Sequence, residues 1–235
     1  YDMVAVVHAE TSTGVCNPIK EIGEFVNKNG ALYLVDCVTS LGGMNVQMDK
    51  WNIDAAYSGT QKCLSCPPGL SPISFSQQAV NKLSNRKSKV PNWYLDLSMI
   101  INYWAGNTRV YHHTAPINML YGLYQSCFNI MEEGLNNVIE RHQTMHQFLV
   151  NNLEQINLHL FVEKNARLPM LNAIKIPDGI NDAHVRSTLL NEFNIEIGGG
   201  LGPLSGKIWR IGLMGETARK ENIEKLISAF NKIFN

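Results

Sequence analysis

The chain has 235 residues and a mass of 26.3 kDa, a length that allows one large domain or two modest ones. Lysine plus arginine and aspartate plus glutamate both number 20, and this zero formal charge argues against an electrostatic nucleic-acid binder. No apolar run approaches the roughly 20 residues that span a bilayer, and the odd number of cysteines, 5, disfavours a disulfide framework. The sequence is therefore typical of a globular protein in a reducing, intracellular compartment, without nucleic-acid or membrane partners.

The first hundred residues are predicted to alternate strand and helix. Apolar runs predict buried strands at residues 3–8, 31–35, 53–58 and 72–75, and residues 9–17 are predicted to be a polar loop. A helix is expected from Pro18 to Gly30, with one apolar face formed by Ile19, Ile22, Phe25 and Val26. This alternation indicates an α/β layer with a largely parallel sheet. A buried strand at the first residues has nothing ahead of it to pair with, so we interpret the chain as a fragment.

From about residue 117 the apolar period becomes helical and continues to residue 156, with Gly134 expected to break or kink the run. Short strands are predicted at 158–162, 171–176, 195–197 and 207–212, interleaved with helices at 182–193 and 218–234. This mixture is typical of a small α+β domain. We therefore expect the C-terminal portion of a large α/β domain at residues 1–133 and a small α+β domain at residues 134–235.

Three motifs that can mark a metal, redox or phosphate site are weak in this sequence. Cys63 and Cys66 have CxxC spacing, but no second pair completes a zinc site, and Pro67 follows where a redox motif needs a helix. His142 and His146 stand four apart on a predicted helix without the glutamate of a zinc protease, which favours two histidines at the edge of the core. The glycine-rich segment 196–202 opens no helix, so a turn is favoured over a phosphate cradle. No metal site is predicted.

One pair of residues is a stronger candidate for chemistry. Asp36 follows one predicted strand, and Lys62 follows the next, at the end of the run Ser-Gly-Thr-Gln-Lys. Ligands of parallel sheets collect beyond the carboxyl ends of the strands, so we expect both side chains near one cleft. A desolvated lysine amine attacks carbonyl carbons, and an opposing carboxylate suits the pyridinium nitrogen of pyridoxal phosphate. An ordinary ion pair on the surface is the alternative interpretation.

Five separated segments resemble the class V aminotransferases. Two form the cofactor-binding core of that family: Asp-Cys-Val-Thr-Ser-Leu-Gly-Gly at 36–43, and Tyr-Ser-Gly-Thr-Gln-Lys at 57–62 with Pro-Pro-Gly at 67–69. The others are His-Ala-Glu-Thr-Ser-Thr-Gly at 8–14, Tyr-His-His-Thr at 111–114, and Gly-Gly-Leu-Gly-Pro at 199–203 leading to Trp-Arg-Ile-Gly at 209–212. In this order they are similar to alanine–glyoxylate (serine–pyruvate) aminotransferases and insect 3-hydroxykynurenine transaminases. The resemblance implies the type I fold of transferases that use pyridoxal 5'-phosphate, with a partial large domain.

The resemblance also implies a role for individual residues. Lys62 would bind the cofactor covalently and move a proton between the substrate Cα and the cofactor C4′, while Asp36 would pair with the pyridinium nitrogen. Thr11 would hydrogen-bond the phenolic side of the cofactor, although it also suits a turn. Gln61 would contact the phosphate.

Three further residues complete the implied site. Tyr111 and Thr114 match family residues that reach the phosphate of the neighbouring subunit's cofactor, which implies a homodimer, although Tyr111 also suits simple packing. Arg210 matches the arginine that grips the substrate carboxylate, and its planar fork suits a bidentate contact. A structural carboxylate is the alternative partner for this guanidinium.

The function implied is transfer of an amino group from alanine or serine to glyoxylate or pyruvate by a ping-pong mechanism. A 3-hydroxykynurenine transaminase and a truncated, non-catalytic chain of the same fold are the alternatives. A cysteine desulfurase would need a nucleophilic cysteine on a loop over the cofactor, and no cysteine here fits that place. The family's glycine loop for the phosphate and its ring-stacking aromatic lie upstream of the segment that matches Tyr1. The chain thus resembles somewhat more than the C-terminal half of these enzymes.

Overall fold

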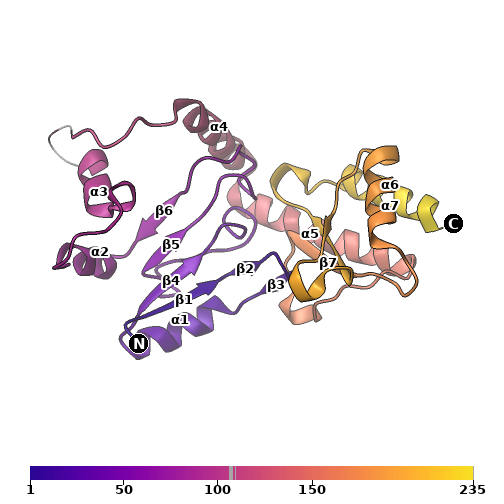
Figure 1. Ribbon diagram of the computed structural model, residues 1–235, viewed down its shortest axis with the longest axis horizontal. Coiled ribbons are helices and arrows are strands. Elements are labelled where there is room, and N and C mark those ends of the chain that lie inside the picture. The colour runs from indigo at the N-terminus through magenta and orange to yellow at the C-terminus, as the bar shows by residue number, and fades with distance from the viewer. Residues whose placement is uncertain (106–107, 109, 235) are drawn as a thin grey trace.

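A four-stranded sheet forms the centre of the N-terminal part in the computed structural model, which describes residues 1–105, 108 and 110–234. The strands lie in the order β1-β4-β5-β6, and they are β1 (Met3–Val7), β4 (Leu32–Asp36), β5 (Ala55–Tyr57) and β6 (Ile73–Phe75). β1, β4 and β5 are parallel, and β6 is antiparallel to β5. The predicted α/β layer is confirmed, with one antiparallel strand at its end (Figure 1).

Helix α1 (Ile19–Lys28) packs on one face of this sheet. Ile19 and Val26 are buried against Tyr33 and Val35 of β4. Phe25 was predicted on the same helical face, but it is 69% exposed. The helical period explains the error, because position 25 lies roughly 120° around the helix from position 19. The other face of the sheet and two helices, α2 (Gln77–Ser84) and α3 (Leu97–Ala105), line a cavity between them. Neither helix was predicted from the sequence.

The segment after β1 differs from its prediction as a polar loop. It forms a short antiparallel hairpin of β2 (Ala9–Glu10) and β3 (Val15–Cys16). Gly14 sits in this turn at φ 81, a conformation that glycine adopts without strain. The hairpin strands have two residues each, too few to show a period-2 pattern, which is why the sequence did not reveal them.

Two long helices follow, α4 (Ile117–Glu133) and α5 (Leu135–Gln155). Gly134 separates them at φ 86, which confirms the predicted break. The apolar stripe of α5 is buried, but that of α4 lies largely on the surface. Large side chains on α4 are 42–79% exposed, and these are Ile117, Leu120, Tyr121, Tyr124, Phe128 and Met131.

The C-terminal part has its own small antiparallel sheet in the order β7-β9-β8. Its elements are β7 (Leu171–Lys175), α6 (Asp182–Phe193), β8 (Gly198–Gly199), β9 (Ile208–Gly212) and α7 (Lys220–Phe234). The strand predicted at 158–162 is wrong, since that segment forms only a bridge from Leu160 to Ile174. The strand predicted at 195–197 is also wrong, because β8 begins one residue later. Short 3-10 helices among the described residues lie at Trp93–Leu95, Lys164–Ala166, Gly202–Leu204 and Gly215–Thr217.

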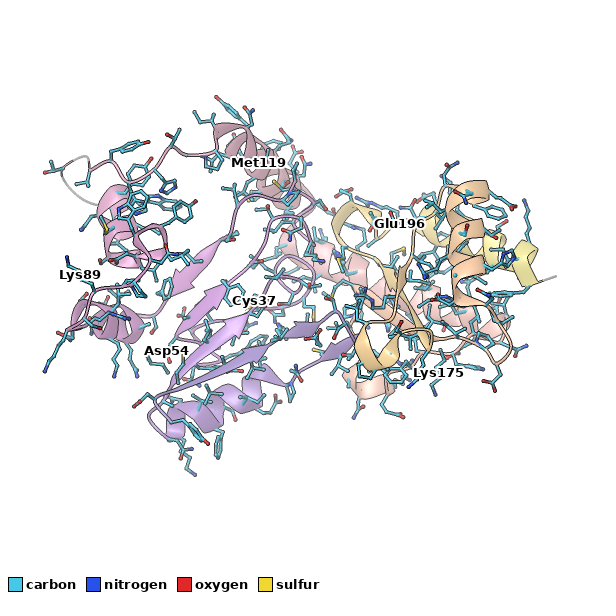
Figure 2. The ribbon with its side chains drawn as sticks, viewed as in Figure 1. Cys37, Asp54, Lys89, Met119, Lys175 and Glu196 are labelled. Atoms are coloured by element: carbon cyan, nitrogen blue, oxygen red, sulfur yellow. The ribbon has the colours of Figure 1, made fainter. Side chains whose placement is uncertain are left out.

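Separate hydrophobic clusters stabilise the two parts. Trp209 and Phe230, both fully buried, stack at 5.7 Å in the C-terminal cluster. Figure 2 shows Cys37 among the strands of the large sheet, and Lys175 and Glu196 in the C-terminal part. A third cluster joins the parts, because Cys63 packs with Leu168 and Met170. Within the described residues, no helix is both long and apolar enough to cross a bilayer.

Candidate active site

Asp36 and Lys62 lie at the carboxyl edge of neighbouring parallel strands. Asp36 is the last residue of β4, where it is in register with Val7 of β1 and Tyr57 of β5. Lys62 follows Tyr57 by five residues, in the loop that leaves the same edge. This is the edge where ligands of open α/β sheets bind, as the sequence analysis expected.

Two donors hold the carboxylate of Asp36. The backbone N–H of Val38 donates to Oδ1, and the Tyr57 hydroxyl donates to Oδ2, both at 2.8 Å. The hydrogen bond to Asp36 is also the main cause of a raised pKa at Tyr57. Tyr57 was not predicted from the sequence as a site residue. Its register with Asp36, which puts both side chains on the same face of the sheet, becomes visible only when the pairing of β4 with β5 is known.

Lys62 lies in a tight turn that also lines a cavity. The Ser65 N–H donates to the Lys62 carbonyl at 3.0 Å, and Ser65 itself adopts φ 58. A cavity of about 340 Å³ contains Gln61 and Lys62 on one side and residues of the C-terminal part on the other, namely Gly212, Met214, Glu216 and Thr217. Lys62 is half-buried and makes none of the ion pairs found in the described part of the chain. Its amine is therefore unpaired beside this cavity.

Arg210 of β9 is oriented by two backbone carbonyls. Its Nε donates to Gly199 O at 2.8 Å, and its Nη1 donates to Thr11 O at 3.1 Å. The contact with Thr11 joins residues 199 positions apart and brings together two predicted site residues from the two parts of the chain. No carboxylate of the described residues forms an ion pair with Arg210. The guanidinium is thus held in place with its charge unpaired.

Tyr111 and Thr114 stand apart from this group, on the segment before α4. Their hydroxyls hydrogen-bond to each other at 2.7 Å, and both side chains are exposed. No hydrogen bond among the described residues joins either side chain to Asp36 or Lys62.

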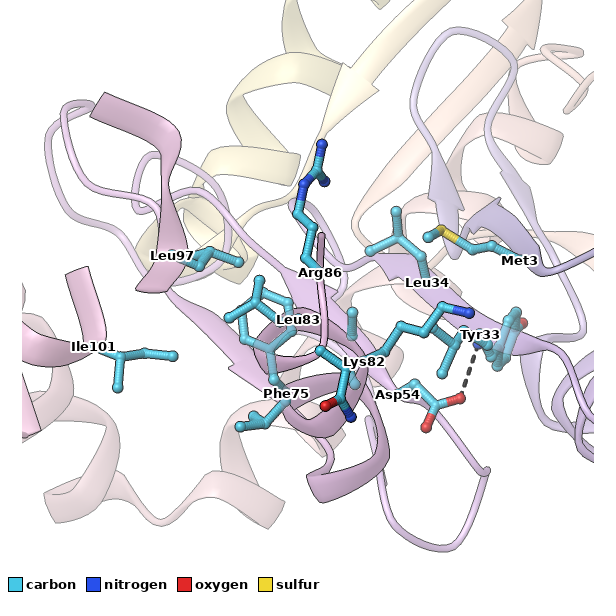
Figure 3. A pocket seen from close by; sticks show the side chains of 15 residues that line it. Met3, Tyr33, Leu34, Asp54, Phe75, Lys82, Leu83, Arg86, Leu97 and Ile101 are labelled. Atoms are coloured by element: carbon cyan, nitrogen blue, oxygen red, sulfur yellow. Dashed lines mark hydrogen bonds between the residues drawn. The ribbon is translucent and has the colours of Figure 1, made fainter. Parts of the chain in front are cut away.

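Another cavity lies away from these residues. It has about 510 Å³ and sits on the sheet face opposite α1, near the amino ends of the parallel strands. Figure 3 shows it between the sheet residues Leu34 and Phe75 and the helical residues Leu83, Leu97 and Ile101. Because sites in such sheets form at the carboxyl ends of the strands, we place the candidate site at the smaller cavity.

The remaining cysteine and histidine signals are structural. Cys63 is buried, and burial raises the pKa of its thiol to about 12, which leaves it a poor nucleophile. His142 and His146 are both buried on α5, deeper than the predicted core edge. His146 hydrogen-bonds Asn172 at 2.6 Å. In the described residues, no three histidine, cysteine, aspartate or glutamate side chains are grouped to hold a metal.

The donor set at the edge of the sheet fits pyridoxal phosphate. The cofactor has a pyridinium nitrogen, an aldehyde and a phosphate, which require an acid, an amine and hydrogen-bond donors. Asp36 offers an oriented carboxylate, Lys62 an unpaired amine and Gln61 an amide next to that amine. An α/β sheet with an acid at one strand end and a lysine in the loop after the next strand, followed by a small α+β unit, is the fold type I scaffold that the resemblance to class V aminotransferases implies.

Comparison with known proteins agrees with this scaffold. The family described as aminotransferase class-V matches residues 1–224. The (S)-ureidoglycine–glyoxylate transaminase of Bacillus subtilis (strain 168) is 40% identical over 94% of this chain and 57% of its own length. The alanine–glyoxylate aminotransferase of Callithrix jacchus is 41% identical over 98% of this chain and 56% of its own length.

A solved structure extends the agreement to the fold. The crystal structure of alanine–glyoxylate aminotransferase from Nostoc sp. superimposes with a TM-score of 0.96 and 50% identity, over 100% of this chain and 62% of that one. The chain belongs to the class V aminotransferase family. It spans somewhat more than half the length of these relatives.

Proposed function

We propose that this chain supplies the catalytic lysine and the substrate arginine of an aminotransferase that moves an amino group from alanine or serine to glyoxylate or pyruvate. The observation that carries the proposal is the carboxyl edge of the sheet. There Asp36 is oriented by two hydrogen bonds, and the unpaired Lys62 lies in the loop after the next strand. When bound, pyridoxal phosphate supplies the electron sink that amino transfer needs.

Each side chain would have a separate task. Asp36 would accept a hydrogen bond from the pyridinium nitrogen and keep that nitrogen protonated. Lys62 would hold the cofactor and then carry a proton between the substrate Cα and the cofactor C4′. Thr11 and Gln61 would donate hydrogen bonds to the phenolic and phosphate sides. Arg210 would bind the substrate carboxylate, because its guanidinium is oriented and unpaired.

The relatives support glyoxylate as the acceptor. The two curated names quoted above share glyoxylate and differ in the amino donor. A small α-keto acid needs one carboxylate contact and little space. Arg210 can supply that contact, and the neighbouring Gly198 and Gly199 have no side chains to fill the space. Alanine and serine are the donors we favour, with 3-hydroxykynurenine as the alternative.

We also propose a homodimer. The apolar stripe of α4 is exposed, with Tyr121, Tyr124 and Met131 each at least 70% accessible. Monomers seldom leave such a contiguous surface uncovered. The exposed hydroxyls of Tyr111 and Thr114 lie just before this helix, where they would reach the phosphate site of a second subunit.

The test is chemical labelling of the full-length protein loaded with pyridoxal phosphate. Reduction with borohydride followed by peptide mapping should place the pyridoxyl group on Lys62. The loaded protein should transfer the amino group of alanine or serine to glyoxylate. A label on Lys50 or another lysine would refute the assignment of Lys62. Absence of label and of transfer would favour the non-catalytic alternative.

A further inference from the structure

The turn that carries Lys62 rests on a segment of the C-terminal part, residues 212–218, which we call the β9–α7 loop. The Glu216 N–H of this loop donates to Ser65 Oγ at 2.8 Å. Ser65 in turn closes the lysine turn through its bond to the Lys62 carbonyl. The position of Lys62 therefore depends on where the β9–α7 loop lies.

Gly215 is the point of closest approach. It adopts φ 57, and a Cβ built on it would overlap Ser65 Oγ and come within 2.9 Å of the Cys63 carbonyl oxygen. Only glycine allows the two backbones to meet in this way. A displacement of Gly215 is thus transmitted directly to Cys63 and Ser65, which follow Lys62 in its turn.

A buried histidine holds Gly215 from the other side. His142 of α5 is 0% exposed, and its Nε2 accepts the Gly215 N–H at 2.9 Å. Its Nδ1 lies 2.7 Å from Val138 O. Since a carbonyl only accepts, Nδ1 carries the proton and Nε2 keeps the free lone pair. The neutral ring with this one tautomer is therefore required for the contact.

Arg141, which precedes His142 on α5, holds the carbonyl oxygen of Gly215. Arg141 Nη1 donates to Gly215 O at 2.8 Å, and Arg141 Nε pairs with Glu133 of α4 at 2.6 Å. Arg141 and His142 together fix both the N–H and the C=O of Gly215. A guanidinium cannot release its proton under ordinary conditions, whereas an imidazole such as that of His142 can take one up. Of the two side chains that hold Gly215, His142 is thus the one whose protonation state changes with pH.

We propose that His142 is a positioning residue for Lys62, acting through Gly215 and Ser65, and that its protonation releases the lysine turn. A proton on Nε2 would turn the acceptor into a donor facing the Gly215 N–H, so the hydrogen bond would be lost. The proposal rests on the proposed role of Lys62. It adds a residue that touches neither cofactor nor substrate.

Burial and the neighbouring charges determine the pH at which His142 takes up a proton. Burial is the main cause that lowers the pKa of His142, and the neighbouring Arg141 lowers it further. The Val138 carbonyl raises it, as do Glu133 of α4 and Glu216 of the β9–α7 loop. The net effect is a lowered pKa of His142. The hydrogen bond from the Gly215 N–H to His142 is therefore intact at neutral pH and is lost in acid.

Amide hydrogen exchange of the full-length protein tests the coupling without relying on activity. In His142→Phe, residues 212–218 and residues 60–66 should both exchange about tenfold faster, because one hydrogen bond is lost. The matched control is His146→Phe, one turn further along α5, which is also buried but bonds Asn172. It should leave residues 60–66 unchanged. In the wild type, protection of both segments should fall as the pH is lowered, and His142→Phe should lack this step.

Ser65→Ala provides the second variant, since Ser65 is exposed and the change does not alter the core. It should speed exchange in both segments even if His142→Phe does not fold. The rate at which Lys62 captures pyridoxal phosphate, measured by borohydride trapping and peptide mapping, should drop about tenfold in His142→Phe but not in His146→Phe. Unchanged exchange at 60–66 in both His142→Phe and Ser65→Ala, or equal effects of the two histidine variants, would overturn the proposal. Trapping at another lysine with the exchange coupling intact would refute the proposed function instead.

Discussion

The hydroxyl of Tyr57 donates to Asp36 Oδ2 at 2.8 Å, across the parallel pairing of β4 and β5. Since the Val38 N–H occupies Oδ1, both carboxylate oxygens are already oriented by the protein. A preorganised acid does not have to reorient when a ligand arrives, which strengthens its electrostatic effect. The residue that orients Asp36 thus comes from the strand that leads to Lys62.

Tyr57→Phe should weaken binding of pyridoxal phosphate about tenfold, or ~1.5 kcal/mol, because it removes one hydrogen bond to a charged group but keeps the ring. Titration of protein fluorescence with the cofactor would measure this. In Asp36→Asn the Tyr57 phenol loses its anionic acceptor, so its raised pKa should return toward the ordinary value in a spectrophotometric titration. Unchanged cofactor affinity in Tyr57→Phe would show that Val38 alone orients the carboxylate.

Arg210→Ala and Arg210→Lys should both lose about 2–4 kcal/mol of transition-state binding, since a bidentate contact between charges is removed and a lysine cannot reproduce the fork. Steady-state kinetics with alanine and with an amine lacking the carboxylate would measure the loss. The wild type should prefer alanine steeply, and both variants should lose that preference. Retained preference would mean that another group binds the carboxylate.

Gly215→Ala should destabilise the fold by about 3 kcal/mol or more, because the added Cβ overlaps Ser65 and the backbone is left-handed. Gly30→Ala is the matched control. Gly30 has a similar φ of 70 but nothing within 4 Å of its built Cβ, so only the backbone strain of about 1–2 kcal/mol applies. Urea unfolding would compare the two, and equal losses would contradict the close approach at Gly215.

His8 should make stability depend on pH. It is buried at the end of β1 with its ring edge-to-face against Trp51, and burial lowers its pKa to about 4. The unfolded chain, with a histidine pKa of about 6.5, binds more protons below that pH, so stability falls between pH of about 6.5 and 4 by up to ~3 kcal/mol. Urea unfolding across this range should show a shallower loss for His8→Phe. Parallel curves for the two proteins would argue against burial of a neutral His8.

The positions of Asp36 and Lys62 could be predicted because each follows a segment that reads as a strand, residues 31–35 before Asp36 and residues 53–58 before Lys62. The contact of Arg210 with Thr11 could not, because 199 residues separate them and only the packing of the two parts brings them together. Tyr57 was overlooked because alternation along β5 shows its face only when the pairing with β4 is known. The amphipathic period identified α4 correctly, but no local pattern distinguishes a buried stripe from one left exposed.

Cys63, the neighbour of Lys62, is 1% exposed in a cluster with Ala9 from the N-terminal part and Leu168, Met170 and Leu171 from the C-terminal part. Each part completes its burial there only in the presence of the other. Such a shared core makes melting all-or-none, because opening either part exposes apolar surface of both. Calorimetry of the protein should therefore show the two parts melting together in a single endotherm. The loss of the lysine site on heating would then coincide with the loss of the whole fold.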